Sequence, residues 1–210
     1  MNAPTTDRAP VSIVRLWLPM AATWFFMAAE GPLLAAVIAR LGDPKPNLAA
    51  FGIASALGLI LEAPVIMVLS AATALADGGH AFRRLRRFVG AMNVAVTIAL
   101  VAIVATPAWE PITTLLRLPP DVDRLARIGL ALLAPWPAAI GYRRFHQGLL
   151  IRAGRTRQVA HGTVVRLSVM AATAAGLFVS GRAPGAWVGC LALSAGVCAE
   201  ALAARWMARD

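Results

Sequence analysis

Six long apolar segments occupy nearly all of this 210-residue chain. A helix needs about 20 residues, at about 1.5 Å of rise per residue, to cross the roughly 30 Å hydrocarbon layer of a bilayer. Each segment is close to that length, and the short connections leave no room for a soluble domain. The sequence therefore predicts an all-α integral membrane protein with a six-transmembrane-helix bundle in one domain, residues 13–206. The segments are 13–39, 48–76, 88–107, 128–151, 159–179 and 186–206.

The composition agrees with a membrane protein. The chain is 59% hydrophobic and 14% charged, whereas soluble domains average about 25% charged residues. Its net charge of +10 would suit a nucleic-acid-binding protein, but the arginines lie mainly in the short connections between apolar segments, as the topology of a membrane protein requires. We therefore expect the lipid bilayer as the surroundings and no nucleic-acid partner.

The distribution of basic residues predicts the orientation. By the positive-inside rule, the more basic side faces the cytoplasm, so both termini are expected there, in the inner (plasma) membrane. Residues 1–12 would form a cytoplasmic leader and residues 207–210 a cytoplasmic tail, and the first segment is too long for a signal-peptide core. The more basic side carries Arg8, Arg15, Arg83, Arg84, Arg86, Arg87, Arg152, Arg155, Arg157, Arg205 and Arg209; the other carries Arg40, Lys45, Arg117, Arg124, Arg127 and Arg182.

The longest outer connection is amphipathic. It covers residues 110–127, with the sequence EPITTLLRLPPDVDRLAR. Alternating apolar and charged residues of this kind favour a segment lying in the plane of the interface. We expect it on the outer surface of the membrane.

Six charged residues fall within the apolar segments, where each costs about 2.5–3.5 kcal/mol on insertion scales and is a candidate for function. Three acids and three bases could simply neutralise one another in a static internal network. Glu200 is expected to pair with an arginine or to extend to the inner interface. The six residues are Glu30, Glu62, Arg143, Arg144, Arg166 and Glu200.

The arginines suggest an anion site. Arg143 and Arg144 precede the fourth connection by about as many residues as Arg166 follows it, so an antiparallel hairpin would bring all three to a similar depth. His146 and Gln147 are three and four residues beyond Arg143, within reach of one helix face. Such a cluster would bind a carboxylate or a phosphate. The alternative is that Arg143 and Arg144 extend to cytoplasmic headgroups.

Two acids adjoin helix-bending residues. Glu30 precedes Gly31 and Pro32, and Glu62 stands two residues before Pro64. Because proline frees a backbone carbonyl and permits a bend in a membrane helix, these acids are candidates for a proton or cation site coupled to motion. The alternative is a static pairing with the arginines.

Enzyme signatures are missing from the sequence. It has no G-x-S-x-G, H-E-x-x-H or Walker-type motif, and the eight-residue spacing of Cys190 and Cys198 fits neither a local disulfide nor a metal-binding knuckle. We expect no catalytic residues, no metal and no cofactor. An enzyme acting on a lipid-linked phosphate would use the same arginines but lacks a recognisable base or metal set.

Two stretches resemble a family of transporters. Residues 16–67, LWLPMAATWFFMAAEGPLLAAVIARLGDPKPNLAAFGIASALGLILEAPVIM, resemble the first two helices of multidrug and toxic compound extrusion (MATE) transporters. Residues 141–167, GYRRFHQGLLIRAGRTRQVAHGTVVRL, resemble the family's fourth helix, its cytoplasmic turn and the start of the fifth. Within the superfamily, the region of Glu30 and the FGIA and QGLLIR runs are most similar to the progressive ankylosis protein branch, which is associated with the export of anions such as pyrophosphate and citrate.

The resemblance implies a transporter, or half of one. Members of the superfamily have twelve helices in two lobes related by a pseudo-twofold axis along the membrane normal, and this chain supplies one lobe. A homodimer or a second six-helix lobe would complete it. The expected function is export of a small anionic solute by alternating access, with Glu30 and Glu62 coupling a proton or cation. The alternative is a six-helix membrane subunit, or a degenerate half, that does not transport.

Overall fold

Helices cover all six predicted segments. The computed structural model describes residues 13–75 and 78–209, so the predicted leader, residues 1–12, lies outside the described residues. Within the described residues, the helix ends lie within four residues of the predicted segment limits, except at the starts of the third and fourth segments, where the helices begin eight to ten residues earlier. The helices are α1 (Ile13–Ile38), α2 (Pro44–Ile66), α3 (Val68–Leu75), α4 (Gly78–Ala105), the 3₁₀ helix η1 (Pro107–Trp109), α5 (Glu110–Leu116), α6 (Pro120–Leu132), α7 (Pro135–Arg152), α8 (Thr156–Ser180) and α9 (Gly185–Met207).

Five of these helical segments are long and apolar enough to cross a membrane. The apolar part of α1 that can be assessed among the described residues, Trp24–Ile38, is shorter. Two of the segments join a pair of helices end to end. The five are Pro44–Leu75, Gly78–Ala105, Pro120–Arg152, Thr156–Ser180 and Gly185–Met207.

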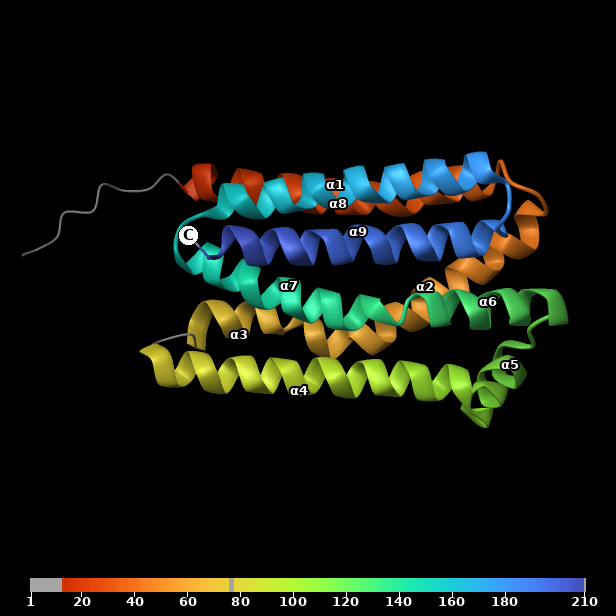
Figure 1. Cartoon of the computed structure of the whole chain (residues 1–210), viewed down its shortest axis with the longest axis horizontal. Helices are drawn as coiled ribbons and strands as arrows, with labels where there is room; N and C mark the ends of the chain where they lie inside the picture. Colours follow the sequence, from red (N-terminus) through yellow and green to blue (C-terminus); the bar gives the residue numbers. More distant parts are fainter. Residues whose placement is uncertain (1–12, 76–77, 210) are drawn as a thin grey trace, which may run out of the picture.

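The helices run along one common axis (Figure 1). α1 and α8 lie along one edge of the bundle and α4 along the opposite edge, with α9, the α6–α7 pair and the α2–α3 pair between them. The start of α1 and the end of α9 lie at the same end of the bundle. The two ends of the described chain therefore lie at the same end of the bundle.

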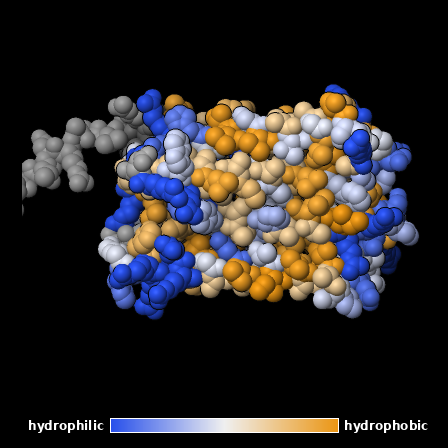
Figure 2. All heavy atoms as spheres, viewed as in Figure 1, coloured by the Kyte–Doolittle hydropathy of each residue, from blue (hydrophilic) through white to orange (hydrophobic). Residues whose placement is uncertain are grey.

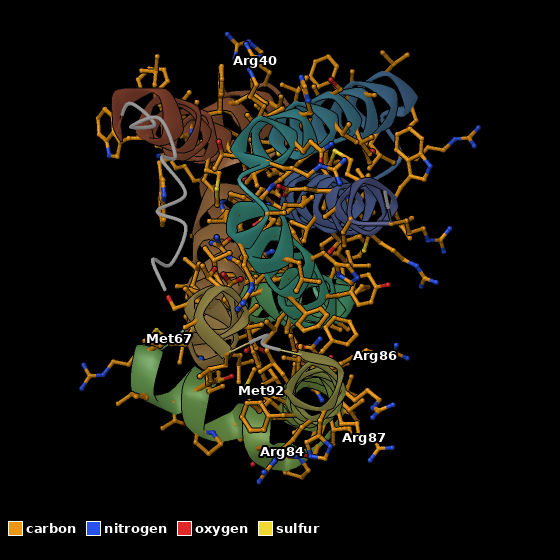
Figure 3. The ribbon with its side chains drawn as sticks, turned by 90° about the vertical axis from the view of Figure 1, so that its left-hand side faces the viewer. Arg40, Met67, Arg84, Arg86, Arg87 and Met92 are labelled. Carbon is orange, nitrogen blue, oxygen red and sulfur yellow. The ribbon has the colours of Figure 1, made fainter. Side chains whose placement is uncertain are left out.

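Polar residues gather at the two ends of the bundle. Figure 2 shows hydrophilic side chains at both ends and a mostly apolar band between them. The end that holds the start of α4 and the end of α9 is the arginine-rich end, and Arg84, Arg86 and Arg87 project there from α4 (Figure 3). An apolar band between two polar ends is the surface that a bilayer-spanning protein presents to lipid.

Both helix pairs are interrupted next to proline. The α2–α3 break is at Met67, three residues after Pro64, and the α6–α7 break at Leu133 and Ala134 directly precedes Pro135. Proline cannot donate a backbone hydrogen bond, so a carbonyl of the preceding turn loses its partner. At the second break the Ser194 hydroxyl of α9 donates to the Leu132 carbonyl at 2.7 Å.

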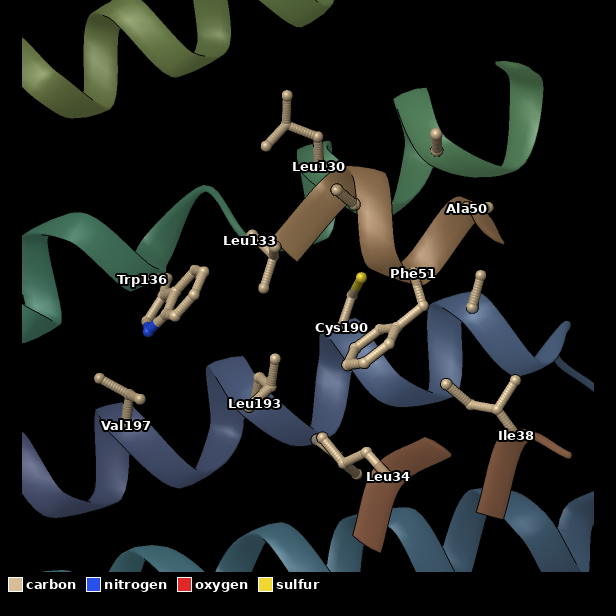
Figure 4. Packing of buried hydrophobic residues seen from close by; sticks show 14 of the residues in the cluster. Leu34, Ile38, Ala50, Phe51, Leu130, Leu133, Trp136, Cys190, Leu193 and Val197 are labelled. Carbon is tan, nitrogen blue, oxygen red and sulfur yellow. The ribbon is translucent and has the colours of Figure 1, made fainter. Parts of the chain in front are cut away.

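Close contacts between helices depend on small residues. A Cβ added to Gly148 of α7 would lie 2.5 Å from the Ala72 Cβ and 3.0 Å from the Leu69 carbonyl oxygen of α3. Only glycine permits this approach, which is how helices in lipid commonly pack. Around the α6–α7 break, Leu133 and Trp136 face the apolar residues of α2 and α9 (Figure 4).

At the end opposite the arginine-rich end, Asn47 joins the connection before α2 to the start of α9. Its Nδ2 donates to the carbonyls of Gly42 and Asp43, at 3.1 and 2.9 Å, and its Oδ1 accepts from the backbone N–H of Ala186 at 2.9 Å. The start of α2 is thereby fixed to the start of α9.

The prediction for residues 110–127 is partly wrong. α5 is a short separate helix, but residues from Pro120 onward form α6, the first part of the fourth long segment. Asp123 stabilises this arrangement, because its Oδ1 accepts hydrogen bonds from Trp109 Nε1 at 2.7 Å and Thr113 Oγ1 at 2.6 Å. Asp121 and Arg124 are exposed, and Arg127 Nε donates to the Val104 carbonyl of α4 at 2.8 Å, so the charged residues do not prevent the helix from packing in the bundle.

Candidate functional site

The six charged residues singled out in the apolar segments are all buried. None exceeds 8% exposure, so neither Arg143 nor Arg144 extends to a headgroup region in this conformation. They come from five helices that pack around one region of the bundle. Glu30 lies on α1, Glu62 on α2, Arg143 and Arg144 on α7, Arg166 on α8 and Glu200 on α9.

Glu200 is the centre of a polar cluster. Its carboxylate forms an ion pair with Arg143 and lies 3.6 Å from Arg166 Nη1. Gln147 Nε2 donates to the other carboxylate oxygen at 3.1 Å, and Thr163 Oγ1 lies 3.5 Å from it. Since Glu200 is completely buried, the expected pairing with an arginine is confirmed and an extension to the interface is excluded for this conformation.

A second ion pair extends the cluster to α1. Arg166 forms an ion pair with Glu30 while its Nη1 faces Glu200. The order Glu30, Arg166, Glu200, Arg143 therefore links α1, α8, α9 and α7 through alternating charges. A buried charge costs several kcal/mol unless it has an opposite charge and hydrogen bonds. The alternation supplies an opposite charge to each residue, but Glu30 Oε1, two nitrogens of Arg143 and two of Arg166 are buried without a hydrogen-bond partner among the described residues.

Glu62 and Arg144 are less well partnered. Among the described residues, neither forms a hydrogen bond or an ion pair, and Glu62 Oε2 and Arg144 Nε are buried without a partner. Glu62 is still close enough to Arg143, Arg144 and Arg166 to be acted on by their charges. The site thus contains one acid and one base that are free to take another partner.

The α2–α3 break lies at the height of these arginines. A Cβ on Gly141 would be 2.7 Å from Val65 Cγ1, and Gly148 meets Ala72, so Met67 is level with the α7 residues between 141 and 148. That stretch contains Arg143, Arg144 and Gln147. An interrupted helix beside polar side chains is the arrangement that transporters use at their binding sites.

A small cavity reaches Arg143 and Arg144. Its volume is about 30 Å³, close to the space of one water molecule. It lies between α1, α3, α7 and α8, and both polar and apolar side chains line it. The lining residues are Trp24, Met27, Leu69, Arg143, Arg144, Gln147, Ile151 and Val159.

His146 lies apart from the other predicted site residues. Its Nδ1 donates to the Tyr142 carbonyl at 2.8 Å, and its ring packs against Tyr142 and Phe145. It lines a different groove between α4, α7 and α9. The structure therefore brings together Glu30, Glu62, Arg143, Arg144, Gln147 and Arg166, but not His146.

Sequence reasoning did not assign Glu200 and Thr163 to the site. Glu200 was recognised as a charged residue in an apolar segment, and that signal was sufficient to include it. Thr163 carries no comparable signal, because a threonine in a membrane helix commonly bonds to the carbonyl four residues earlier, as Thr163 also does to Val159 at 3.4 Å. Within residues 13–75 and 78–209, no group of three or more His, Cys, Asp or Glu side chains could hold a metal ion.

Comparisons of the chain with protein-family models, curated proteins and solved structures find no match. The similarity to MATE transporters therefore stays a prediction from the two sequence stretches. What the described structure contributes is an all-helical bundle with several membrane-length apolar helices and a buried cluster of charges.

Proposed function

We propose that this protein is a six-span inner-membrane transporter, or half-transporter, that moves a small anionic solute by alternating access. The observation that carries the proposal is the buried arginine cluster beside a break in a membrane-length helix. Three guanidiniums share this region, and Arg144 has no ion-pair partner among the described residues. A carboxylate or phosphate would form charge-assisted hydrogen bonds with such groups.

Transport of the solute would be coupled to protons because Arg166 would exchange the Glu30 carboxylate for the solute. In the structure Arg166 is occupied by Glu30. A proton that binds the Glu30 carboxylate removes its negative charge, and an anion that enters can then pair with Arg166. Glu62, whose Oε2 is buried without a hydrogen-bond partner among the described residues, would be a second protonation site. Anion and proton would then occupy the site together without leaving an unbalanced buried charge.

The substrate path needs more than this conformation provides. A cavity of about 30 Å³ holds a water molecule rather than an organic anion. We therefore propose that a second copy of the chain, or a partner six-helix lobe, completes the path, as in transporters built from repeated lobes. Both termini would face the cytoplasm, because the arginine-rich end follows the positive-inside rule.

A second candidate function is a membrane subunit that does not transport. The two direct ion pairs, Arg143 with Glu200 and Arg166 with Glu30, favour it. In that case the charges form a static network that fixes how the helices pack, and neutralising one of them lowers stability only.

Arg144 distinguishes the two functions, since it has no described ion pair to lose. We would reconstitute the chain in proteoliposomes and measure flux of citrate and pyrophosphate, anions that the family resemblance suggests. The transporter predicts that Arg144→Gln reduces flux at least tenfold while the unfolding temperature changes little. Arg157→Gln, at an exposed position of the arginine-rich end, is the control and should keep normal flux. Unchanged flux in Arg144→Gln, or a loss of stability with no flux in the unmodified protein, would favour the static subunit.

A further inference from the structure

A groove at the arginine-rich end is separate from the buried charge cluster. It has a volume of about 400 Å³ and lies between α4, α7 and the end of α9. This volume is in the range of pockets that hold small organic ligands. The lining residues are Phe82, Arg86, Val89, Gly90, Asn93, Tyr142, Phe145, His146, Leu149, Arg205, Ala208 and Arg209.

The groove has an apolar wall and a cationic rim. Phe82 and Phe145 pack with ring centroids 5.5 Å apart, and Val89 and Leu149 lie beside them. Arg86, Arg205 and Arg209 supply three positive charges, and the described lining residues include no acid. A ligand that matches both parts must combine hydrocarbon with a negative charge.

Hydrogen bonds pre-position the polar groups of the groove. Arg205 Nη1 donates to the Tyr142 hydroxyl at 2.9 Å, which holds the guanidinium against α7. His146 Nδ1 donates to the Tyr142 carbonyl, so Nε2 of the neutral ring is an acceptor, and the groups that meet an anion are the arginines. Preorganised groups lose less conformational freedom when a ligand binds.

The position of the groove identifies the kind of ligand. Figure 2 shows hydrophilic side chains at this end, next to the apolar band, and Arg86 projects at the same end in Figure 3. In a bilayer this is the level of the phospholipid headgroups, and basic pockets between membrane helices bind anionic headgroups there. We propose that the groove between α4, α7 and α9 binds one anionic phospholipid, with its phosphate at Arg86 and Arg205 and its acyl chains along Val89 and Gly90, which lie farther from the arginine-rich end than Arg86.

The role of the groove arginines Arg86 and Arg205 can be tested by comparing them with two arginines of α4 that lie outside the groove. Arg83 and Arg84 belong to a separate surface hollow with His80 and Arg87, and Arg84 projects from a different side of α4 than Arg86 (Figure 3). The double variants Arg86→Gln/Arg205→Gln and Arg83→Gln/Arg84→Gln remove the same charge. Only the first should weaken binding of phosphatidylglycerol, by about ten- to thirtyfold for two arginines near the membrane surface.

The shape of the groove can be tested without changing any charge. Gly90 lines the groove, and a Cβ added to it meets no atom within 4 Å. Gly90→Leu should therefore fill the groove and reduce binding of the lipid at least tenfold. Gly176→Leu is the control, because Gly176 on α8 is equally open and lies outside the groove.

Native mass spectrometry of the delipidated protein in mild detergent would measure binding of phosphatidylglycerol, and of phosphatidylcholine with the same chains. The proposal expects preference for phosphatidylglycerol, losses in both groove variants and none in either control. Size-exclusion profiles would verify that each variant is folded. Equal binding of phosphatidylcholine, equal loss in Arg83→Gln/Arg84→Gln, or unaltered binding in Gly90→Leu would overturn it. Displacement of the lipid by millimolar inorganic phosphate would also overturn it, since the groove would then be a site for a soluble anion.

Discussion

The Arg166 guanidinium on α8 is ion-paired with the Glu30 carboxylate on α1, 136 positions earlier in the chain. Each of these charges would be costly to bury alone. Their pairing joins the first long apolar segment to the fifth, and through Glu200 it continues to α9 and α7. The packing of these helices and the chemistry of the site therefore depend on the same side chains.

The ion pair of Arg166 and Glu30 predicts that the losses of unfolding free energy in variants of the two residues are not additive. Arg166→Gln leaves Glu30 buried without its opposite charge and should cost about 3–5 kcal/mol of unfolding free energy. The double variant Glu30→Gln/Arg166→Gln removes one charge of each sign and should recover at least half of that loss. Unfolding in mixed micelles of increasing SDS fraction measures both. Additive losses in the double variant would show that the two residues do not interact.

The close contact at Gly148 predicts that a larger side chain there destabilises the packing of α7 against α3. A leucine at this position would have to separate α7 from α3, because even a Cβ would lie 2.5 Å from Ala72. We expect Gly148→Leu to lower the unfolding free energy by about 1–3 kcal/mol. Gly52→Leu is the matched control, since Gly52 on α2 has no neighbour within 4 Å. Similar losses in the two variants would mean that the close contact of α3 and α7 contributes nothing.

The hydrogen bond of Ser194 predicts a smaller loss of stability at the α6–α7 break. Ser194→Ala removes the 2.7 Å hydrogen bond to the Leu132 carbonyl and should cost about 0.6 kcal/mol, the average for hydrogen bonds between membrane helices, and at most about 1.7 kcal/mol. Ser180→Ala removes a bond of the same length within an exposed helix end, to Leu177, and should change stability by much less. The same unfolding assay compares them, and an equal effect of both would rule out a special role for the break.

The orientation predicts a labelling pattern. In a background with Cys190 and Cys198 replaced by alanine, an impermeant maleimide should label Arg182→Cys in intact cells. It should label Arg157→Cys only after the membrane is opened, because Arg157 lies at the arginine-rich end. Both positions are exposed. The reverse pattern would place the arginine-rich end outside and contradict the positive-inside assignment.

The helical segments were predictable because length and apolarity alone define them. The start of the fourth was missed, since Asp121, Asp123 and Arg124 indicated a surface segment. Helix periodicity was the better signal: Val122, Ala126, Gly129 and Leu130 are buried, and a spacing of three and four residues places them on one face.

The site was predictable in composition but not in geometry. Counting residues from the connection placed Arg143, Arg144 and Arg166 at a similar depth in the membrane. Such counts do not fix how each helix is rotated about its own axis. Successive residues turn by about 100°, so His146 points about 200° away from Arg144. For this reason His146 lines the groove with α4 and α9, whereas Arg144 faces the cavity with α1 and α3. The choice of Glu30 as the partner of Arg166 likewise depends on tertiary packing.

The hydrogen bonds of Asn47 create a fixed point of contact between α2 and α9. They hold the starts of α2 and α9 together at the end opposite the arginine-rich end. A helix of this length extends about 30 Å beyond that point, so a tilt of about 5° moves its far end by about 3 Å and its near end hardly at all. A tilt of either helix about this contact would therefore displace the arginine-rich end of the bundle most.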